Sequence, residues 1–533
     1  MLWLMFFVCL ICENTNINLS FRYKQCYDES VKMLSVERGE RMKEERVHGF
    51  LLIINELVRC SNADWERKYK SLLERTDTKQ TVETSFNFTK SRFVFSVSRR
   101  IPQYQAVSLA PSQIAIIESQ ICRQLVSEKF DYMCLDVLSQ RLSRSSHIQQ
   151  SFLTILPRLA TFDRGNFVKQ HLSTVMNHIF NIIKSREKER AKAFVTIGMI
   201  AIAVESDIEP YVERIMEIIR MYLPRGDILG RKKSPIDASI FNCVTFMSHA
   251  LKNHGKMEIP NLLEPMLATG LTASLTICLR ELSRKVPEHK EKISLGLLKM
   301  LSYILLNKHL VHPGMPRHLT GTVMSLGIPE VSDTQIIVLA LKTLGTFDFE
   351  GQRLLPFVHR CANHFLVHDN NEIRLEAVRT TCRLLRHAIH STAKNSSETV
   401  TKTVAAVLHR LLSVGLTDTD PNVRYGVLIS LDRTFDNHLA QAESLSALFV
   451  ALQDEMFEIR EVALFTIGRL SAMNPAYVMP SLRKTLVQLL SELEHSGSGR
   501  NKEQGARMLD HLVVSAPRMI RPYMEPILKV RTW

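Results

Sequence analysis

Asp418-Thr419-Asp420-Pro421-Asn422-Val423-Arg424 opens one helical segment of this 533-residue sequence, and Asp454-Glu455-Met456-Phe457-Glu458-Ile459-Arg460 opens another 36 residues later. In both stretches an Asp lies six residues before an Arg, and an aliphatic residue lies directly before that Arg. Another aliphatic residue follows four positions after it. This spacing predicts helices that each bury one apolar face. A second helical segment is expected after each of them, at 439–452 and at 475–493.

This order of elements indicates a helical hairpin that is used more than once. A unit of two short helices cannot bury its apolar face alone, so it is stable only when it stacks on neighbouring units. We therefore predict an all-α fold, a HEAT/armadillo-like superhelical solenoid of stacked helical hairpins.

Two internal similarities support one repeated unit. Ala193-Phe194-Val195-Thr196-Ile197-Gly198 is similar to Ala463-Leu464-Phe465-Thr466-Ile467-Gly468, and each is followed by a break that contains Pro and Tyr. Four further residues recur at an offset of 42, a spacing within the range of about 40 to 47 typical of HEAT and armadillo units. These are Leu470, Pro475, Pro480 and Leu486, which recur as Leu512, Pro517, Pro522 and Leu528.

Composition and periodicity divide the chain into six parts. The apolar stretch 1–24 is an atypical leader, and 61–112, where periodicity fades, is an inserted loop or linker. A connector rich in Pro and Gly occupies 311–332. HEAT repeats are predicted in the remaining parts, which are 25–60, 113–310 and 333–533.

The two ends of the chain carry separate expectations. Residues 1–12 are almost wholly apolar but too short to span a bilayer as a helix. They also lack the basic region and the cleavage site of a secretory signal, so we do not expect secretion. A start read from non-native upstream sequence and an apolar helix cap both remain open. At the other end we find no polar cap, so we expect either a continuation past Trp533 or a covering partner.

The overall composition is that of a folded, soluble protein, with 45% hydrophobic and 23% charged residues. The net charge of +14, from 68 basic and 54 acidic residues, could signal a polyanionic partner. The excess is spread thinly, however, and the charged run 184–190 has mixed signs and no interleaved aromatic residues for base stacking. We therefore predict an ordinary helical surface and no nucleic-acid partner.

The ten cysteines show no paired zinc-site spacing. They are scattered among apolar segments, which is typical of buried thiols in a reducing compartment.

Sequence motifs for common catalytic chemistry are missing. There is no GxxxxGK[ST], GxGxxG, GxSxG or HExxH, and the kinase signatures HRD and DFG are absent. We therefore predict no catalytic, cofactor-binding or metal-ligating residue, no cofactor and no direct small-molecule substrate.

One segment of the sequence holds a cluster of potential metal ligands. His359, Cys361, His364 and His368 fall in one predicted helical segment, and the last two are expected one turn apart. Two residues so placed could share a metal. Because no convincing ligand set surrounds them, we interpret all four as ordinary residues on a helix flank.

Asp418 and Asp420 could suggest paired carboxylates for acid–base chemistry, but a structural role is the better interpretation. Asp420 directly precedes Pro421 and is predicted to cap a helix by accepting backbone N–H bonds. Asp418 is predicted to pair with an Arg of the adjacent repeat. HEAT proteins often use such positions as a ladder between units, and Arg374, Arg424 and Arg460 resemble that pattern.

Longer runs carry a resemblance to a known family. The region 439–528 resembles part of the amino-terminal HEAT solenoid of the target of rapamycin (TOR) kinase. Earlier stretches at 48–59, 262–267 and 312–316 agree, so the resemblance covers most of 25–530 and is weakest at about 61–112. The main runs are Phe457-Glu458-Ile459-Arg460-Glu461, Gly468-Arg469-Leu470-Ser471, Met473-Asn474-Pro475-Ala476, Glu494-His495-Ser496-Gly497 and Ile520-Arg521-Pro522-Tyr523-Met524-Glu525-Pro526.

This resemblance implies a function and partners. The family is a serine/threonine kinase that governs growth in response to nutrients. Its rapamycin-binding and kinase domains would lie beyond Trp533, so no catalytic residue is carried over and this chain is not expected to be an enzyme. The resemblance implies a scaffold in TOR complexes (TORC1 and TORC2), with a raptor-type adaptor and a TOR dimer partner. It also implies a cytoplasmic location, with lysosomal or endomembrane surface association through the complex. Residues 1–24 do not resemble the family.

Three rival interpretations remain at this stage. The first is an unrelated HEAT transport or adaptor protein of the karyopherin kind. The second is a fragment whose kinase activity belongs to a longer parent. The third is a basic nucleic-acid scaffold, which predicts binding that weakens steeply with salt.

Overall fold

The computed structural model describes residues 19–34, 40–62, 111–223, 238–251, 255–306, 333–349, 354–392, 398–495 and 498–530. Within these ranges helix is the only regular secondary structure. The described residues form two compact units, one ending at Gly296 and the other beginning at Leu297, and helix α15 (Lys290–Leu306) crosses this boundary. The predicted all-α solenoid of stacked hairpins is confirmed.

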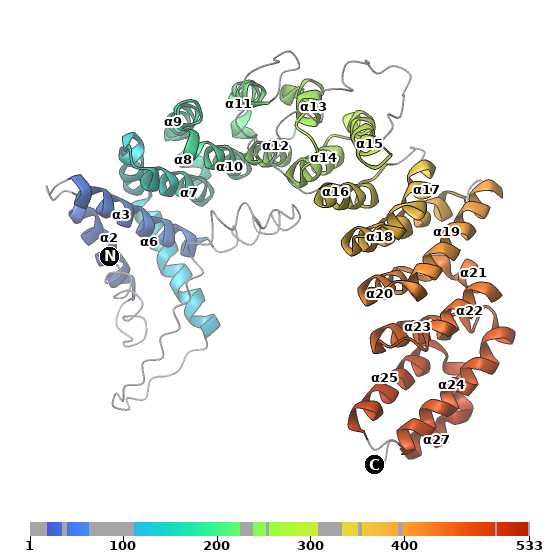
Figure 1. The fold of residues 1–533 in the computed structure, drawn as a ribbon. Helices are drawn as coiled ribbons and strands as arrows, with labels where there is room; N and C mark the ends of the chain where they lie inside the picture. Colours follow the sequence, from blue (N-terminus) through green and yellow to red (C-terminus); the bar gives the residue numbers. More distant parts are fainter. Residues whose placement is uncertain are drawn as a thin grey trace, which may run out of the picture. The chain divides into compact units, whose positions relative to one another are not determined.

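In the first unit, α3, α7, α10, α12 and α14 pack side by side in one row, each against the next. Figure 1 shows α9, α11 and α13 along one side of this row. The helices of this unit are α2 (Leu19–Leu34), α3 (Glu40–Ser61), α6 (Pro111–Ser139), α7 (Ser146–Phe162), α8 (Arg164–Gln170), α9 (Leu172–Ser185), α10 (Glu187–Val204), α11 (Glu209–Tyr222), α12 (Ser239–Ala250), α13 (Ile259–Leu267) and α14 (Ala273–Lys285).

The second unit repeats the arrangement with α16, α18, α20, α23 and α25 in one row and α17, α19, α22, α24 and α27 in the other (Figure 1). Its helices are α16 (Asp333–Thr346), α17 (Leu355–Asn363), α18 (Asn371–Thr392), α19 (Glu398–Thr417), α20 (Pro421–Ser430), α21 (Asp436–Leu439), α22 (Ala442–Ala451), α23 (Phe457–Leu470), α24 (Pro475–His495), α25 (Gly499–Ser515), α26 (Pro517–Ile520) and α27 (Met524–Val530).

The two similar segments that the sequence indicated occupy equivalent places. One lies on α10 and the other on α23, and each is followed by a helix that starts with Pro in its first turn. Their glycines allow close packing: a Cβ on Gly198 would lie 2.7 Å from Cδ2 of Phe246, and one on Gly468 would lie 2.0 Å from Oγ of Ser515. The shared glycine is therefore where each helix meets the next one of its row.

The helices predicted at 439–452 and 475–493 appear as α22 and α24. Helix α22 begins later than predicted because residues 433–439 form a 3-10 turn and the short α21. Among the predicted segments, helix α2 crosses the expected boundary between residues 24 and 25. Most of the leader (1–18), most of the predicted linker (63–110) and the connector 311–332 lie outside the described residues.

Among the described helices, none combines the length and the apolar character that are needed to cross a bilayer.

Candidate functional site: an arginine ladder between repeats

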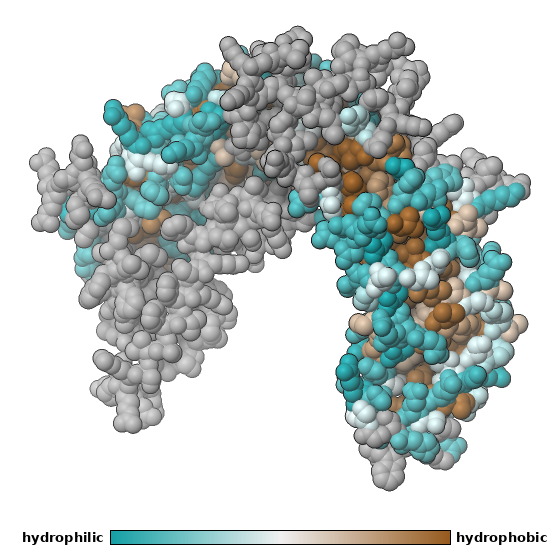
Figure 2. Space-filling view, in the orientation of Figure 1, coloured by the Kyte–Doolittle hydropathy of each residue, from teal (hydrophilic) through white to brown (hydrophobic). Residues whose placement is uncertain are grey.

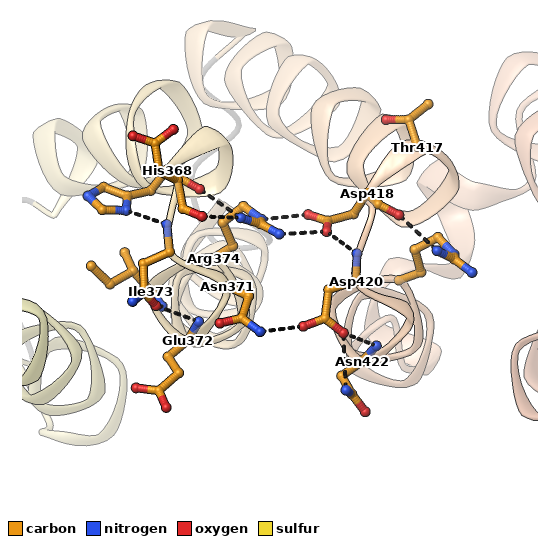
Figure 3. Close-up of polar contacts among 12 residues, drawn as sticks. His368, Asn371, Glu372, Ile373, Arg374, Thr417, Asp418, Asp420 and Asn422 are labelled. Carbon is orange, nitrogen blue, oxygen red and sulfur yellow. Dashed lines mark hydrogen bonds and ion pairs between the residues drawn. The ribbon is translucent and has the colours of Figure 1, made fainter.

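The segment between α19 and α20 is organised by Asp420. Its Oδ1 accepts a hydrogen bond from the backbone N–H of Asn422 at 2.8 Å, so Asp420 caps α20 as predicted. Its Oδ2 accepts a bond of 2.7 Å from the side-chain amide of Asn371, in the first turn of α18 (Figure 3). These bonds, first that from Asn371, lower the pKa of the Asp420 carboxyl. The residue therefore joins the starts of two successive helices of one row.

Arg374 and Asp418 make the first rung of the ladder. The Arg374 guanidinium donates from Nε and Nη2 to the two Asp418 oxygens at 2.8 and 2.9 Å. Its Nη1 donates to the backbone carbonyls of His368 and Asp369, both at 2.9 Å (Figure 3). The predicted pairing of Asp418 with an Arg of the neighbouring repeat is confirmed.

The second rung repeats this geometry between α20 and the turn before α23. Nε and Nη2 of Arg424 donate to the Asp454 oxygens at 2.9 and 3.0 Å, and Nη1 donates to the carbonyl of Asp418 at 2.8 Å. Nη2 also reaches Glu455 at 3.0 Å. The Arg424 and Asp454 side chains are only 8% and 9% exposed, so this pair is held away from water.

Arg460 keeps only half of the pattern. Its Nη1 donates to the backbone carbonyls of Asp454 and Glu455 at 2.8 and 3.1 Å, as in the other rungs. Where a carboxylate would stand, Nη2 meets the Gln504 amide oxygen at 3.4 Å. The predicted ladder pattern therefore holds for the bonds of Arg460 within its own repeat. In the neighbouring repeat, its partner on α25 is the uncharged Gln504 instead of an acid.

A comparable rung in the first unit was missed. Arg164, at the start of α8, donates from Nε and Nη2 to Asp207 at 2.9 and 2.8 Å and from Nη1 to Glu205 at 2.7 Å. The preceding Asp163 caps α8 by accepting from the N–H of Asn166. The sequence signal was an acidic cap residue, Asp163, next to an Arg. Arg164 follows this cap directly, whereas Arg424 follows its cap Asp420 by four residues.

The chemistry of the ladder is that of structural ties. Bidentate bonds between a guanidinium and a carboxylate fix the geometry of the pair as well as contributing energy. Asp418 accepts from Arg374 and from the N–H of Asp420, and Asp420 accepts from Asn371 and Asn422. This arrangement favours holding the repeats in register over proton transfer.

The histidines do not share one helix. Helix α17 ends at Asn363, His364 terminates it, and His368 follows the 3-10 turn Phe365–Val367. The prediction of His364 and His368 one turn apart on a helix is therefore wrong. Nδ1 of His368 accepts from the N–H of Asn370 at 3.0 Å, and Cys361 is buried. Within the described ranges, no group of three His, Cys, Asp or Glu residues is arranged to hold a metal ion.

Exposed apolar side chains form a second feature of the second unit. Val450 on α22 is 60% exposed, and on α24 Tyr477 is 39% and Val487 55% exposed. The Tyr477 hydroxyl lies 2.6 Å from Oγ of Ser446, which joins α24 to α22. Figure 2 shows apolar residues in brown among hydrophilic ones over the part of the molecule that holds α18 to α24. We call Val450, Tyr477 and Val487 the apolar row, after the row of helices that contains α22 and α24.

Two proteins similar to this chain are named as serine/threonine-protein kinases. The chain is 43% identical, over 95% of its length, to the serine/threonine-protein kinase mTor of Drosophila melanogaster, and covers 22% of that protein. It is 35% identical over 76% of its length to the serine/threonine-protein kinase tor1 of Schizosaccharomyces pombe, and covers 17% of it. The chain thus spans about a fifth of the length of these relatives. No family model matches it.

Solved structures are much less similar. A crystal structure of importin beta has a TM-score of 0.42 and 12% identity, with 90% of this chain and 68% of that chain covered. A similarity of this size carries no inference beyond the helical architecture already described.

Proposed function

The chain belongs to the target of rapamycin (TOR) family of serine/threonine-protein kinases, and from this premise we propose that it is a protein-binding scaffold that catalyses no phosphotransfer itself. Because the chain spans about a fifth of its relatives, we assign the kinase activity to other parts of such proteins. Within each unit the stacked hairpins supply what a scaffold needs, which is a binding surface built from repeats.

We propose further that this scaffold takes part in assembling TOR complexes for nutrient-responsive growth signalling. Its partners would be a raptor-type adaptor and a second TOR protomer. Its place would be the cytoplasm, with association to lysosomal or other endomembrane surfaces through the assembled complex.

The apolar row is the observation that carries the binding role. Val450 and Val487 have aliphatic side chains that are more than half exposed, at 60% and 55%, and Tyr477 contributes an aromatic ring with a polar tip. Aromatic residues are enriched in the buried centres of protein interfaces, where apolar side chains are withdrawn from water. The contact of its hydroxyl with Ser446 holds Tyr477 in place before a partner arrives.

The test is a binding assay with purified raptor-type adaptor and the full chain carrying Val450→Glu. We expect affinity to fall by at least about tenfold, because a charge would be buried in an apolar contact. Val514→Glu is the matched control, since Val514 is a 65% exposed valine on α25, in the other row of helices. Equal affinity of the wild type and Val450→Glu would reject the apolar row as the adaptor site.

The non-catalytic half of the proposal has its own test. The full chain is incubated with radiolabelled ATP, magnesium and a peptide substrate of TOR-type kinases. We expect no labelled peptide, because the sequence holds neither of the kinase motifs that position the catalytic base and magnesium. Label transfer that stays with the chain through further purification would overturn this half.

A further inference from the structure

Two cysteines from distant parts of the sequence meet in the first unit. Cys60 lies near the end of α3 and Cys122 lies on α6, and these two helices pack against each other. The side chains of Cys60 and Cys122 are in hydrogen-bond contact. Both cysteines are reduced in this structure.

The surroundings of Cys60 contain charges of both signs. Nη2 of Arg59 donates to the Cys60 sulfur at 3.7 Å, and the Cys60 thiol points to Oε1 of Glu56 at the same distance. Arg59 and Glu56 also pair with each other. The bond from Cys122 and the Arg59 charge outweigh burial and the Glu56 charge, so the pKa of Cys60 lies below its ordinary value.

Other described cysteines are in the opposite situation. Burial raises the pKa of Cys134, Cys243, Cys278, Cys361 and Cys382 to about 12. Since the thiolate is the reactive form of cysteine, these five are inert near neutral pH. Among the cysteines in the part of the chain that the structure describes, Cys60 has surroundings that favour the reactive thiolate.

Exposure sets an order of events within the pair. Cys60 is partly exposed, whereas Cys122 is 0% exposed, so Cys60 is the member of the pair that a small oxidant would reach first. A buried partner in contact with the reactive sulfur is the arrangement of a resolving cysteine, which attacks the oxidised one from inside the protein.

We propose that Cys60 and Cys122 form a peroxide-responsive dithiol that closes to a disulfide between α3 and α6. The Cys60 thiolate attacks one oxygen of hydrogen peroxide, the O–O bond breaks, and the leaving hydroxide takes up a proton to become water. This two-electron oxidation leaves Cys60 as a sulfenic acid. The Cys122 sulfur then attacks the Cys60 sulfur, a second water leaves with the Cys122 proton, and the S–S bond forms.

The bond would tie the ends of the segment 61–121 together. Cross-linking positions far apart in the sequence restricts the unfolded chain, so the oxidised form should melt at a higher temperature. In a reducing compartment small thiols reverse such bonds, which makes the change transient.

The first test needs no variant. The native full chain is treated with hydrogen peroxide, unreacted thiols are alkylated, and a non-reducing digest is analysed by mass spectrometry. We expect a cross-linked peptide pair joining Cys60 to Cys122, lighter by two hydrogens than the reduced pair and lost on treatment with dithiothreitol. We also expect iodoacetamide to label Cys60 at least roughly tenfold faster than Cys134, on the same helix as Cys122.

Variants separate the two steps. In Cys122→Ser we expect no cross-link and a Cys60 sulfenic acid that dimedone traps. In Cys60→Ser we expect neither product at Cys122, and Cys134→Ser should behave as wild type. Circular dichroism confirms that each variant is folded. Labelling of Cys60 no faster than Cys134, or oxidation of native Cys60 to sulfinic acid with Cys122 still alkylatable after denaturation, would overturn the proposal.

Discussion

Arg424 binds two acidic side chains that differ in exposure, since Asp454 is 9% and Glu455 76% exposed. Removing the buried partner leaves a guanidinium that is nearly withdrawn from water and has lost two hydrogen bonds. We expect Asp454→Ala to lower the free energy of unfolding of the second unit by about 3 kcal/mol. Glu455→Ala is the control and should change it by about 0.5 kcal/mol or less. Thermal melting followed by circular dichroism compares the two, and equal losses would contradict a role for burial.

The same rung predicts a dependence on pH. Burial raises the pKa of Asp454, but the bonds from Arg424 and from the N–H of Met456 outweigh it, so the net pKa is lowered. A carboxyl with a lowered pKa stabilises the fold above its unfolded pKa of about 3.9, and that contribution is lost as the pH falls through the folded pKa. The melting temperatures of wild type and Asp454→Ala should therefore converge below about pH 4. A constant gap down to pH 2 would contradict this.

Lys192 on α10 is a residue whose removal should stabilise the protein. Burial, together with the nearby charge of Arg158 on α7, lowers its pKa to about 8. Since the unfolded pKa is about 10.4, the folded state disfavours the charged form, and at pH 7 it carries that cost. We expect Lys192→Met to raise the free energy of unfolding by about 1 to 2 kcal/mol at pH 7.

The gain in free energy of unfolding from Lys192→Met should shrink between about pH 8 and 10.4. In this range wild-type Lys192 is mostly neutral in the folded state but still charged in the unfolded state, so the cost of burying its charge disappears. Lys188→Met is the control, because Lys188 lies on the same helix but is exposed. Melting at pH 7 and pH 10 measures both variants. A gain that is as large at pH 10 as at pH 7 would assign the effect to packing rather than charge.

At the scale of helices, Gly198 decides how closely α10 approaches α12. Ala is the better helix former by about 1 kcal/mol, so Gly→Ala in a helix is ordinarily stabilising. Here the new methyl would lie 2.7 Å from Cδ2 and 2.9 Å from Cβ of Phe246, which is buried between the helices. We expect this clash to outweigh the gain in helix propensity, so that Gly198→Ala lowers the free energy of unfolding by about 1 to 2 kcal/mol net.

The control for Gly198 is Gly499→Ala, at the start of α25, where an added methyl meets no atom within 4 Å. That variant should be neutral or slightly stabilising in the same melting experiment. If Gly198→Ala also stabilised the protein, this would contradict the inference that α10 and α12 leave no room for a methyl group.

The features that could be predicted from the sequence are those that recur with the repeat. Asp420 precedes a helix and caps it, and Asp418 pairs with Arg374, because cap and ladder residues have fixed places relative to a helix start. The helices themselves follow from apolar spacing. Local chemistry of this kind depends on residues that are near in sequence or one repeat away.

The remaining features depend on pairs without such a fixed spacing. Gln504 replaces the acid opposite Arg460, and an uncharged amide gave no signal of a rung. Arg164 reaches Asp207 and Glu205 through a different placement of Arg relative to its cap. Cys60 and Cys122 meet because α3 packs on α6. Sequence spacing does not predict which residues of these two helices face each other. Packing between helices, not periodicity, determines these contacts.

At the scale of the molecule, each row of helices is a chain of contacts between neighbours. In the second unit, α18 packs on α20, α20 on α23 and α23 on α25. Stability in such arrays is close to a sum of repeat and interface terms, so unfolding need not be a single all-or-none step. One melting temperature is therefore a poor measure of where a substitution acts.

Hydrogen exchange measured by mass spectrometry can locate the effect of Asp454→Ala. The lost rung joins α20 to the turn before α23, so the interface between these helices should open more often. We expect amide exchange to become faster by about tenfold or more in peptides from α20, α22 and α23, because local opening energies fall with the interface that is weakened. Peptides from α7 and α10 should be unchanged, since neighbour-only coupling fades over several repeats. Faster exchange of similar size in α7 would show instead that the repeats unfold as one cooperative body.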